Sequence, residues 1–187
     1  MTLGYGDLKK GITIELDGTP YLVVDYEQRK MQKRAPVLRV RLKDIKTGRV
    51  IEKAFQGFDV KLVPANVERR NAQYIYDEGE LFYFMDNETY EQFALTREQL
   101  TDTLKFIKPE LNVDVLFFEG TAVTVDLPNN VNLKVTEAPP AVKGDTAQGG
   151  TKPITLETGL TIQVPLFINQ GEIIRVDTRT GEYLSSA

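Results

Sequence analysis

The chain has 187 residues, of which 41% are hydrophobic and 27% are charged, and its formal net charge is −4. It has no cysteine and no histidine, which excludes disulfides and cysteine-ligated zinc and removes the commonest general base and metal ligand. It also contains no apolar run near the roughly 18 residues of a membrane span, and residues 1–12 have neither the basic start nor the apolar core that is typical of a signal peptide. We therefore expect a cytoplasmic protein without membrane contact, cofactor or metal.

The charge is unevenly distributed along the chain. Residues 1–64 have a net charge of +5, residues 65–128 of −8 and residues 129–187 of −1. A protein that presents one end to a polyanion benefits from such segregation, because basic groups neutralise phosphates and release counterions. Chance clustering on an exposed face explains the pattern equally well, so charge alone leaves both interpretations open.

Residues 1–64 alternate apolar and polar residues between turn signals, which is typical of short strands. The dipeptide Asp17-Gly18 predicts a two-residue hairpin turn, because both of its positions need positive φ. This density of strands favours a small SH3-like barrel that ends near Pro64. The predicted strands are 11–16, 20–26, 36–44 and 49–55.

Residues 65–128 combine strands with one predicted helix, as in an oligonucleotide/oligosaccharide-binding (OB) barrel. Thr96 and Gln99 form a capping-box pattern, Leu100 and Leu104 follow at helical spacing, and Pro109 would stop the helix. Residues 129–187 predict a second barrel of this kind, with a long loop at 139–153. The predicted strands are 72–77, 81–86, 91–95, 113–118 and 122–127, then 131–136, 160–165 and 173–177.

The stretch 28–53 is the most basic part of the chain, with ten Lys or Arg against two acids, Asp44 and Glu52. Its tip lies between two predicted strands and should project as a hairpin loop. Such a cluster of cations is either a solvated loop or a contact for phosphates, and the residues alone do not decide between them. The candidate residues at the tip are Arg29, Lys30, Lys33 and Arg34.

Two other regions are weaker candidates. Within the loop 139–153, Gly144, Asp145 and Thr146 either form an ordinary turn or contact RNA, while Arg175, Arg179 and Tyr183 are possible RNA contacts. The acidic and aromatic run 74–93 would suit a carboxylate-based glycan-active enzyme. No carboxylate pair stands out there, and a solvated acidic face explains the run more simply.

A dense set of motif positions lies between Thr151 and Tyr183, and its order and spacing resemble the C-terminal signature of bacterial translation elongation factor P. The resemblance extends over the whole chain in length and element order. It implies a ribosome-binding factor, not an enzyme. The matching positions are Lys152, Thr155, Leu156, Thr158, Gly159, Val164, Pro165, Phe167, Gly171, Val176, Asp177, Thr178, Arg179, Gly181 and Tyr183.

The resemblance implies three consecutive β-barrels, a KOW-type SH3-like barrel over 1–64 and OB-type barrels over 65–128 and 129–187, in an elongated, L-shaped outline similar to tRNA. It also implies a monomer that binds the 70S ribosome between the P and E sites and contacts the P-site peptidyl-tRNA. The implied activity is faster peptide-bond formation at consecutive prolines. Gly144, Asp145 and Thr146 would approach the E-site codon.

The resemblance places the family's tip loop, of the form Lys-Pro-Gly-Lys-Gly, on residues 30–34. Lys33 then occupies the tip position, which in the family reaches the acceptor end of the P-site tRNA and is often extended by a modifying enzyme; Arg34 is the rival. Met31, Gln32 and Arg34 replace the family's proline and glycines. Without glycines we expect the loop to turn by another conformation than the left-handed one.

A second functional hypothesis is a general RNA-binding or chaperone module built on the same barrels, which would bind single strands through basic grooves and aromatic stacking. The strongly acidic middle third argues against it.

Overall fold

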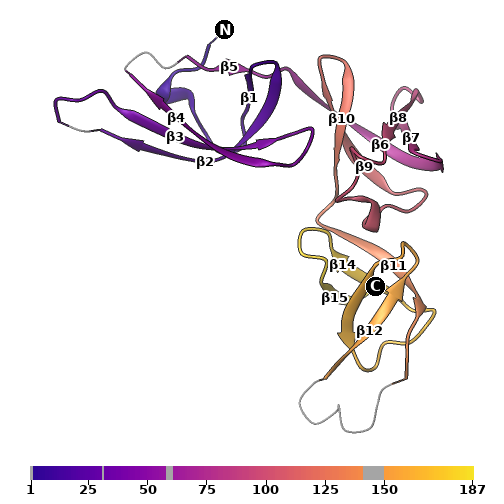
Figure 1. The fold of residues 1–187 in the computed structure, drawn as a ribbon. Helices are drawn as coiled ribbons and strands as arrows, with labels where there is room; N and C mark the ends of the chain where they lie inside the picture. Colours follow the sequence, from indigo (N-terminus) through magenta and orange to yellow (C-terminus); the bar gives the residue numbers. More distant parts are fainter. Residues whose placement is uncertain (1, 31, 58–60, 141–149) are drawn as a thin grey trace. The chain divides into compact units, whose positions relative to one another are not determined.

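The computed structural model describes residues 2–30, 32–57, 61–140 and 150–187 (Figure 1). Its strands form three five-stranded sheets, which confirms the mainly β fold class. The described residues contain no α-helix and two short 3-10 helices, η1 (Tyr5–Asp7) and η2 (Leu104–Phe106). Within the same residues, no helix is long and apolar enough to cross a membrane.

The first sheet has the strand order β4-β3-β2-β1-β5. Asp17 and Gly18 close the β1–β2 hairpin with φ values of 50° and 79°, which confirms the predicted turn. In β3, Leu38, Val40 and Leu42 are buried while the residues between them are exposed, so one face of the strand meets the core. The strands are β1 (Thr13–Leu16), β2 (Thr19–Arg29), β3 (Val37–Asp44), β4 (Val50–Gln56) and β5 (Val63–Pro64).

The second sheet has the order β10-β9-β6-β7-β8, and the third has the order β13-β12-β11-β14-β15. Two strands of the third sheet were not predicted, namely β12, which begins at Thr151 inside the loop predicted at 139–153, and the last strand, β15. The bounds are β6 (Val67–Glu78), β7 (Leu81–Asp86), β8 (Gln92–Thr96), β9 (Asn112–Phe118) and β10 (Thr121–Asp126), then β11 (Asn130–Glu137), β12 (Thr151–Leu156), β13 (Thr161–Pro165), β14 (Ile173–Asp177) and β15 (Tyr183–Ser186).

The helix predicted after Thr96 is replaced by turns and by η2. The capping box does form, since the Thr96 N–H donates to Gln99 Oε1 at 2.8 Å and the Gln99 N–H to Thr96 Oγ1 at 3.2 Å. The Thr101 hydroxyl, however, donates to the carbonyls of Arg97 and Glu98, and the Thr103 hydroxyl donates to that of Leu100. Threonine side chains that bond to the backbone compete with a regular helix, so the segment continues in 3-10 geometry.

The chain divides into two compact units, residues 1–70 with 115–124 and residues 71–114 with 125–187. In the first, one core lies inside the N-terminal sheet, and a smaller one joins Ile45 of the β3–β4 turn to Phe118 and Val123. In the second, the C-terminal core includes Phe106 of η2. The Thr158 hydroxyl donates to the Lys105 carbonyl at 2.6 Å, so this unit is tied by both apolar and polar contacts.

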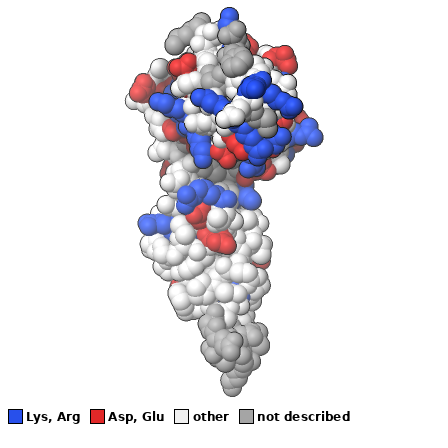
Figure 2. All heavy atoms as spheres, turned by 90° about the vertical axis from the view of Figure 1, so that its left-hand side faces the viewer, with Lys and Arg blue, Asp and Glu red and all other residues white. Residues whose placement is uncertain are grey.

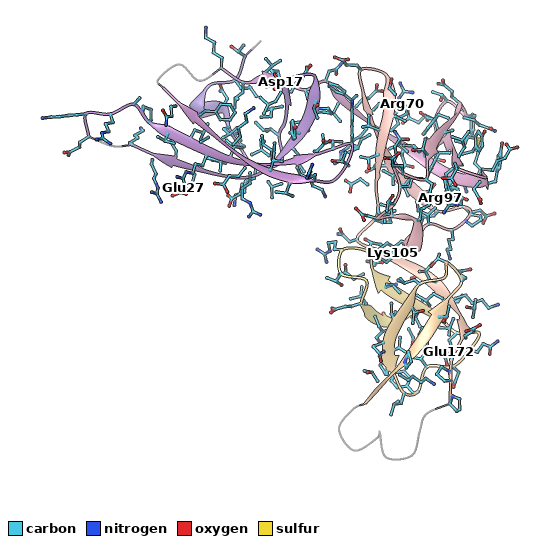
Figure 3. All side chains as sticks on the ribbon, in the orientation of Figure 1. Asp17, Glu27, Arg70, Arg97, Lys105 and Glu172 are labelled. Atoms are coloured by element: carbon cyan, nitrogen blue, oxygen red, sulfur yellow. The ribbon has the colours of Figure 1, made fainter. Side chains whose placement is uncertain are left out.

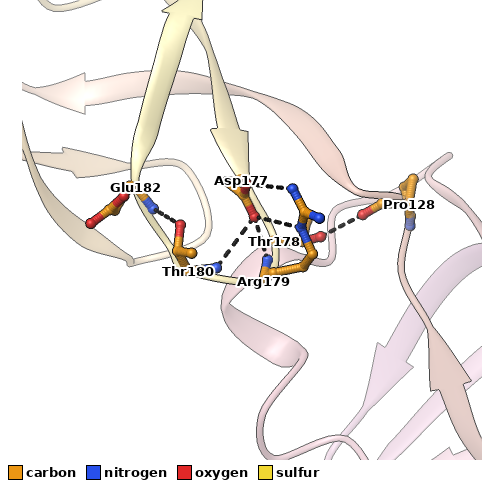
Figure 4. A network of polar contacts seen from close by, with 6 residues as sticks. All are labelled: Pro128, Asp177, Thr178, Arg179, Thr180 and Glu182. Atoms are coloured by element: carbon orange, nitrogen blue, oxygen red, sulfur yellow. Dashed lines mark hydrogen bonds and ion pairs between the residues drawn. The ribbon is translucent and has the colours of Figure 1, made fainter.

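Three hairpins close with the same six-residue turn, at 44–49, 86–91 and 177–182 (Figure 4 shows the last). The first residue is Asp, whose Oδ1 accepts the N–H groups two and three residues later at 2.7 to 3.3 Å. The fourth is Thr, whose Oγ1 accepts an N–H two residues later. The fifth has positive φ and is Gly48, Tyr90 or Gly181. Local side-chain chemistry therefore specifies one turn per sheet.

Candidate nucleic-acid interface

The basic stretch folds into the long β2–β3 hairpin, whose ladder runs from Tyr21 opposite Asp44 to Arg29 opposite Val37. On its other side, β3 pairs with β4 along its whole length, starting with Val37 opposite Gln56. Pro36 is buried, and its carbonyl accepts the Gly57 N–H at 3.2 Å. The hairpin is thus held by backbone pairing as far as Arg29 and Val37, and Lys30 and residues 32–35 extend beyond this last pair.

The tip of this hairpin turns at Lys33, which has a φ of 66°. Gln32, Lys33, Arg34 and Ala35 are all exposed. The expectation that a loop without glycine would avoid the left-handed conformation is wrong, because Lys33 itself adopts it. That conformation costs a residue with a Cβ roughly 1–2 kcal/mol. The turn is therefore destabilised at Lys33, the residue predicted to contact the tRNA.

Along the stem, a β-bulge brings acids opposite the basic residues. The register shifts between Val23 and Asp25, which leaves Val24 as the extra residue. As a result, Asp25 lies opposite Arg41 and Glu27 lies opposite Arg39. Glu52 of β4 is the other neighbour of Arg41. The stretch that the sequence predicted to be basic is therefore flanked by acids, and red spheres lie among the blue ones on the upper part of the surface in Figure 2.

Two ion pairs extend this compensation. Glu27, labelled in Figure 3, accepts from Arg29 Nε at 3.0 Å, and Asp25 meets Lys10 Nζ at 3.3 Å. The pKa of Asp25 is lowered by the hydrogen bond from the Tyr26 N–H, then by the bond and charge of Lys10, with a smaller contribution from Arg41. Arg29, a predicted RNA contact, is thus paired inside the stem.

The remaining three predicted tip residues differ from Arg29. Lys30, Lys33 and Arg34 are exposed and make no hydrogen bond or ion pair with any residue that the structure describes. Like charges this close in sequence repel one another unless solvent or a polyanion compensates them. The geometry therefore presents a compact cationic end on a charge-compensated stem, which suits phosphate contact.

The C-terminal candidates are in different environments. Arg175 is exposed on β14, between Asn132 of β11 and Ser185 of β15. Arg179 is held by Asp177, with its Nη2 at 3.1 Å from Oδ2. This bond and the donation from the Arg179 backbone lower the pKa of Asp177, and the same contact raises the pKa of Arg179. Of these two arginines, Arg175 is the one without a fixed partner among the described residues.

The other predicted site residues are Tyr183 and residues 144–146. Tyr183 is half-buried and packs against the C-terminal core, so its ring serves the fold. Gly144, Asp145 and Thr146 lie outside the described residues.

Acids of the run 74–93 form hydrogen bonds and an ion pair within the fold. Asp86 closes a turn, Glu80 meets Arg97 Nε at 3.4 Å, and Asp77 accepts from the Tyr74 hydroxyl at 3.0 Å. Burial, followed by the bond to Asp77, raises the pKa of Tyr74 to about 12. In the part of the chain that the structure describes, no group of three or more acids could hold a metal ion.

The stem acids Asp25 and Glu27 were not among the predicted site residues. They lie just before the basic stretch, and only the bulge at Val24 aligns them with Arg41 and Arg39. An alternation count without a bulge places Val24 and Tyr26 there instead. No residue pattern predicts such a bulge, so the placement of these acids opposite the two arginines could not be predicted from the sequence.

Comparison with known families finds three models that together match most of the chain. "Elongation factor P (EF-P) KOW-like domain" matches residues 5–60, "Elongation factor P (EF-P) OB domain" matches 67–125, and "Elongation factor P, C-terminal" matches 131–185.

Curated relatives named "Elongation factor P" are similar over nearly their full length. The Moorella thermoacetica protein is 49% identical over 181 residues, which are 97% of each chain. The Thermoanaerobacter sp. protein is 52% identical over 179 residues, which are 96% of each chain.

Solved structures show a similar fold. "Eukaryotic translation initiation factor 5A from Methanococcus jannaschii" has a TM-score of 0.54 and 23% identity, covering 67% of this chain and 94% of that one. At this identity the likeness concerns the fold alone.

Proposed function

The chain belongs to the elongation factor P family and is a translation elongation factor, and from this premise we propose that it relieves ribosomes stalled at consecutive prolines. It binds the 70S ribosome between the P and E sites. There it holds the acceptor end of the P-site peptidyl-tRNA in a reactive position. Proline is a poor partner in peptide-bond formation because its ring fixes φ and replaces the primary amine.

The observation that carries this proposal is the charge pattern of the β2–β3 hairpin. Its stem is compensated by Asp25 and Glu27, whereas Lys30, Lys33 and Arg34 have no partner among the described residues. Exposed cations at the end of a paired ladder contact phosphate without first breaking an ion pair. Positioning of a reactant in this way lowers the barrier without acid–base chemistry.

Lys33 is the residue we assign to the tRNA acceptor end. Its left-handed backbone sets the turn that presents its side chain at the tip. A lysine-modifying enzyme that extends Lys33 would lengthen the arm, and Arg34 would remain beside it for backbone phosphates. Residues 144–146 are assigned to the E-site codon, and the factor acts as a monomer.

The test is synthesis of a reporter with three consecutive prolines in a reconstituted bacterial translation system. Protein from its native host, which keeps any modification of Lys33, should restore full-length product, and Lys33→Ala should remove most of that effect. Lys53→Ala is the matched control, because Lys53 is an exposed lysine of the same sheet and should keep full activity.

A reporter without prolines must be translated equally with every variant. Equal loss for Lys33→Ala and Lys53→Ala would contradict the proposal and favour the general RNA-binding module. No rescue by the unaltered protein would contradict the proline-specific activity itself.

A further inference from the structure

One end of the third sheet carries two side chains that the function above does not use. Strands β12 and β13 pair there, with Thr151 opposite Pro165 and Lys152 opposite Val164. The chain then turns, and the Ile168 N–H donates to the Pro165 carbonyl at 3.2 Å. Lys152 and Phe167 therefore lie at the same end of this sheet, on neighbouring segments.

The side chain of Lys152 lies on the inner face of its strand, unlike that of an ordinary surface lysine. It alternates with Ile154 and Leu156 on the inner face of β12, and only 6% of its surface is exposed. Its ammonium has no hydrogen bond or ion pair with any residue that the structure describes. Complete burial of a charge without a partner would be costly.

The Lys152 ammonium still reaches solvent. No described side-chain nitrogen or oxygen is both sealed from solvent and without a partner. Because the ammonium has no such partner, it must emerge from the core while its aliphatic stem stays buried. The fold thus holds a positive charge at the end of the sheet in a position accessible to an anion.

Phe167 is the second feature of this end. Its surface is 66% exposed, whereas the next residue, Ile168, is completely buried in the C-terminal core. The turn after Pro165 thus uses Ile168 to anchor the segment and leaves the Phe167 ring in solvent. An exposed aromatic ring and a cation at one end of a sheet are groups with which proteins hold single-stranded RNA, by stacking on a base and pairing with a phosphate.

We propose that Lys152 and Phe167 form a contact site for single-stranded RNA, with a phosphate at the Lys152 ammonium and a base stacked on the Phe167 ring. This inference rests on the proposed function, since a ribosome-bound factor would meet such a strand as the messenger. Two acids, the exposed Glu137 and the half-buried Glu172, lie at the same end. Stacking therefore contributes more than charge, and the salt dependence of binding is shallow.

The chain offers a clean reporter for this site because it contains no tryptophan. Phe167→Trp introduces a single indole where the ring would stack, and an unstructured hexauridylate RNA should quench its fluorescence saturably. Tyr90→Trp is the matched control, because Tyr90 is 71% exposed in the acidic middle part of the chain. It should not be quenched.

Adding Lys152→Met to the Phe167→Trp protein should weaken RNA affinity about tenfold and reduce the slope of log affinity against log salt by about 0.7. Circular dichroism should show that the double variant remains folded. Affinity unchanged by Lys152→Met would remove the phosphate contact and overturn the site as proposed.

Absence of quenching in Phe167→Trp, or equal quenching of the indole at position 90, would also overturn the inference. A failure of the proposed function can be distinguished from a failure of the RNA site. If the unaltered protein does not relieve the proline stall but the indole of the Phe167→Trp protein is quenched and responds to Lys152→Met, the RNA site stands without that activity.

Discussion

The β2–β3 tip and the three aspartate turns are all hairpin ends, yet they are built in opposite ways. In the turns at 44–49, 86–91 and 177–182, side-chain oxygens occupy the free backbone N–H groups. The tip at 30–35 has no such bond among the described residues, and its left-handed position is Lys33 where two of the turns have glycine. The turns use their polar groups for the fold, whereas the tip leaves them for a ligand.

This contrast distinguishes cations that pair with a local acid from cations that have no such partner among the described residues. Arg179 belongs to a turn and is tied to Asp177, and Arg29 belongs to the stem and is tied to Glu27. Lys33 and Arg34 have neither kind of tie to a described residue. Exposure alone does not distinguish these four cations, but the presence of a local acid does. Substitutions in the turns should therefore cost stability, and substitutions at the tip should cost function.

The largest effect is expected at Asp86, which is 4% exposed and accepts the N–H groups of Glu88 and Thr89. Asp86→Ala leaves both donors without this acceptor and should lower the free energy of unfolding by about 2–3 kcal/mol. Urea unfolding followed by circular dichroism measures this change.

Asp44→Ala is the control for this prediction. Asp44 makes the same bonds but is half-exposed, so water replaces the lost acceptor and the cost should be about 1 kcal/mol. Equal costs at the two positions would show that burial does not govern these turns.

A second effect should appear in acid at Asp177. Its pKa is lowered from 3.8, first by the side chain of Arg179. A lowered folded pKa gives a stabilising contribution that is complete above the unfolded value and is lost as pH falls through the folded one. Asp177→Asn keeps an acceptor oxygen but cannot titrate. The difference in melting temperature between the two proteins should thus shrink between about pH 5 and pH 2. A constant difference would contradict the ion pair.

The fold was predictable where its cause is local. Asp17-Gly18 specifies a turn with two positive φ values, and both occur. The alternation of β3 specifies which residues face the core, and Leu38, Val40 and Leu42 do so. Turn chemistry and alternation act over a few residues, so one sequence suffices to see them.

The features that were not predicted depend on contacts between distant parts of the chain, which the local sequence does not indicate. Strand β12 was not predicted because it contains Pro153, which is compatible with this strand although it cannot donate to a ladder. The inward position of Lys152 followed from that missed strand. The compensation of Arg39 and Arg41 depends on the bulge at Val24, whose register is fixed only by pairing with β3.

A smaller effect is expected at the tip. Lys33→Gly removes the cost of a left-handed residue with a Cβ, which exceeds the added flexibility of the unfolded chain, so stability should rise by up to about 1 kcal/mol. Rescue of the proline reporter should fall sharply at the same time. Arg34→Gly is the control, because Arg34 is not at positive φ and gains nothing. A loss of stability in Lys33→Gly would mean that the tip is built like the turns.

The smallest effect tests the stem. Lys10 is the only lysine within ion-pair distance of Asp25 among the described residues, at 3.3 Å, and Lys10→Met should move the pKa of Asp25 toward 3.8. It should stay below that value, because the Tyr26 N–H, the largest cause of the shift, and Arg41 both remain. Carbon-detected NMR titration of the Asp25 carboxylate measures the change, with Lys9→Met as a neighbouring control. If Lys10→Met left the pKa unaltered, the carboxylate would be held by the backbone alone. The stem would then be less compensated than its geometry implies, and the contrast with the tip would narrow.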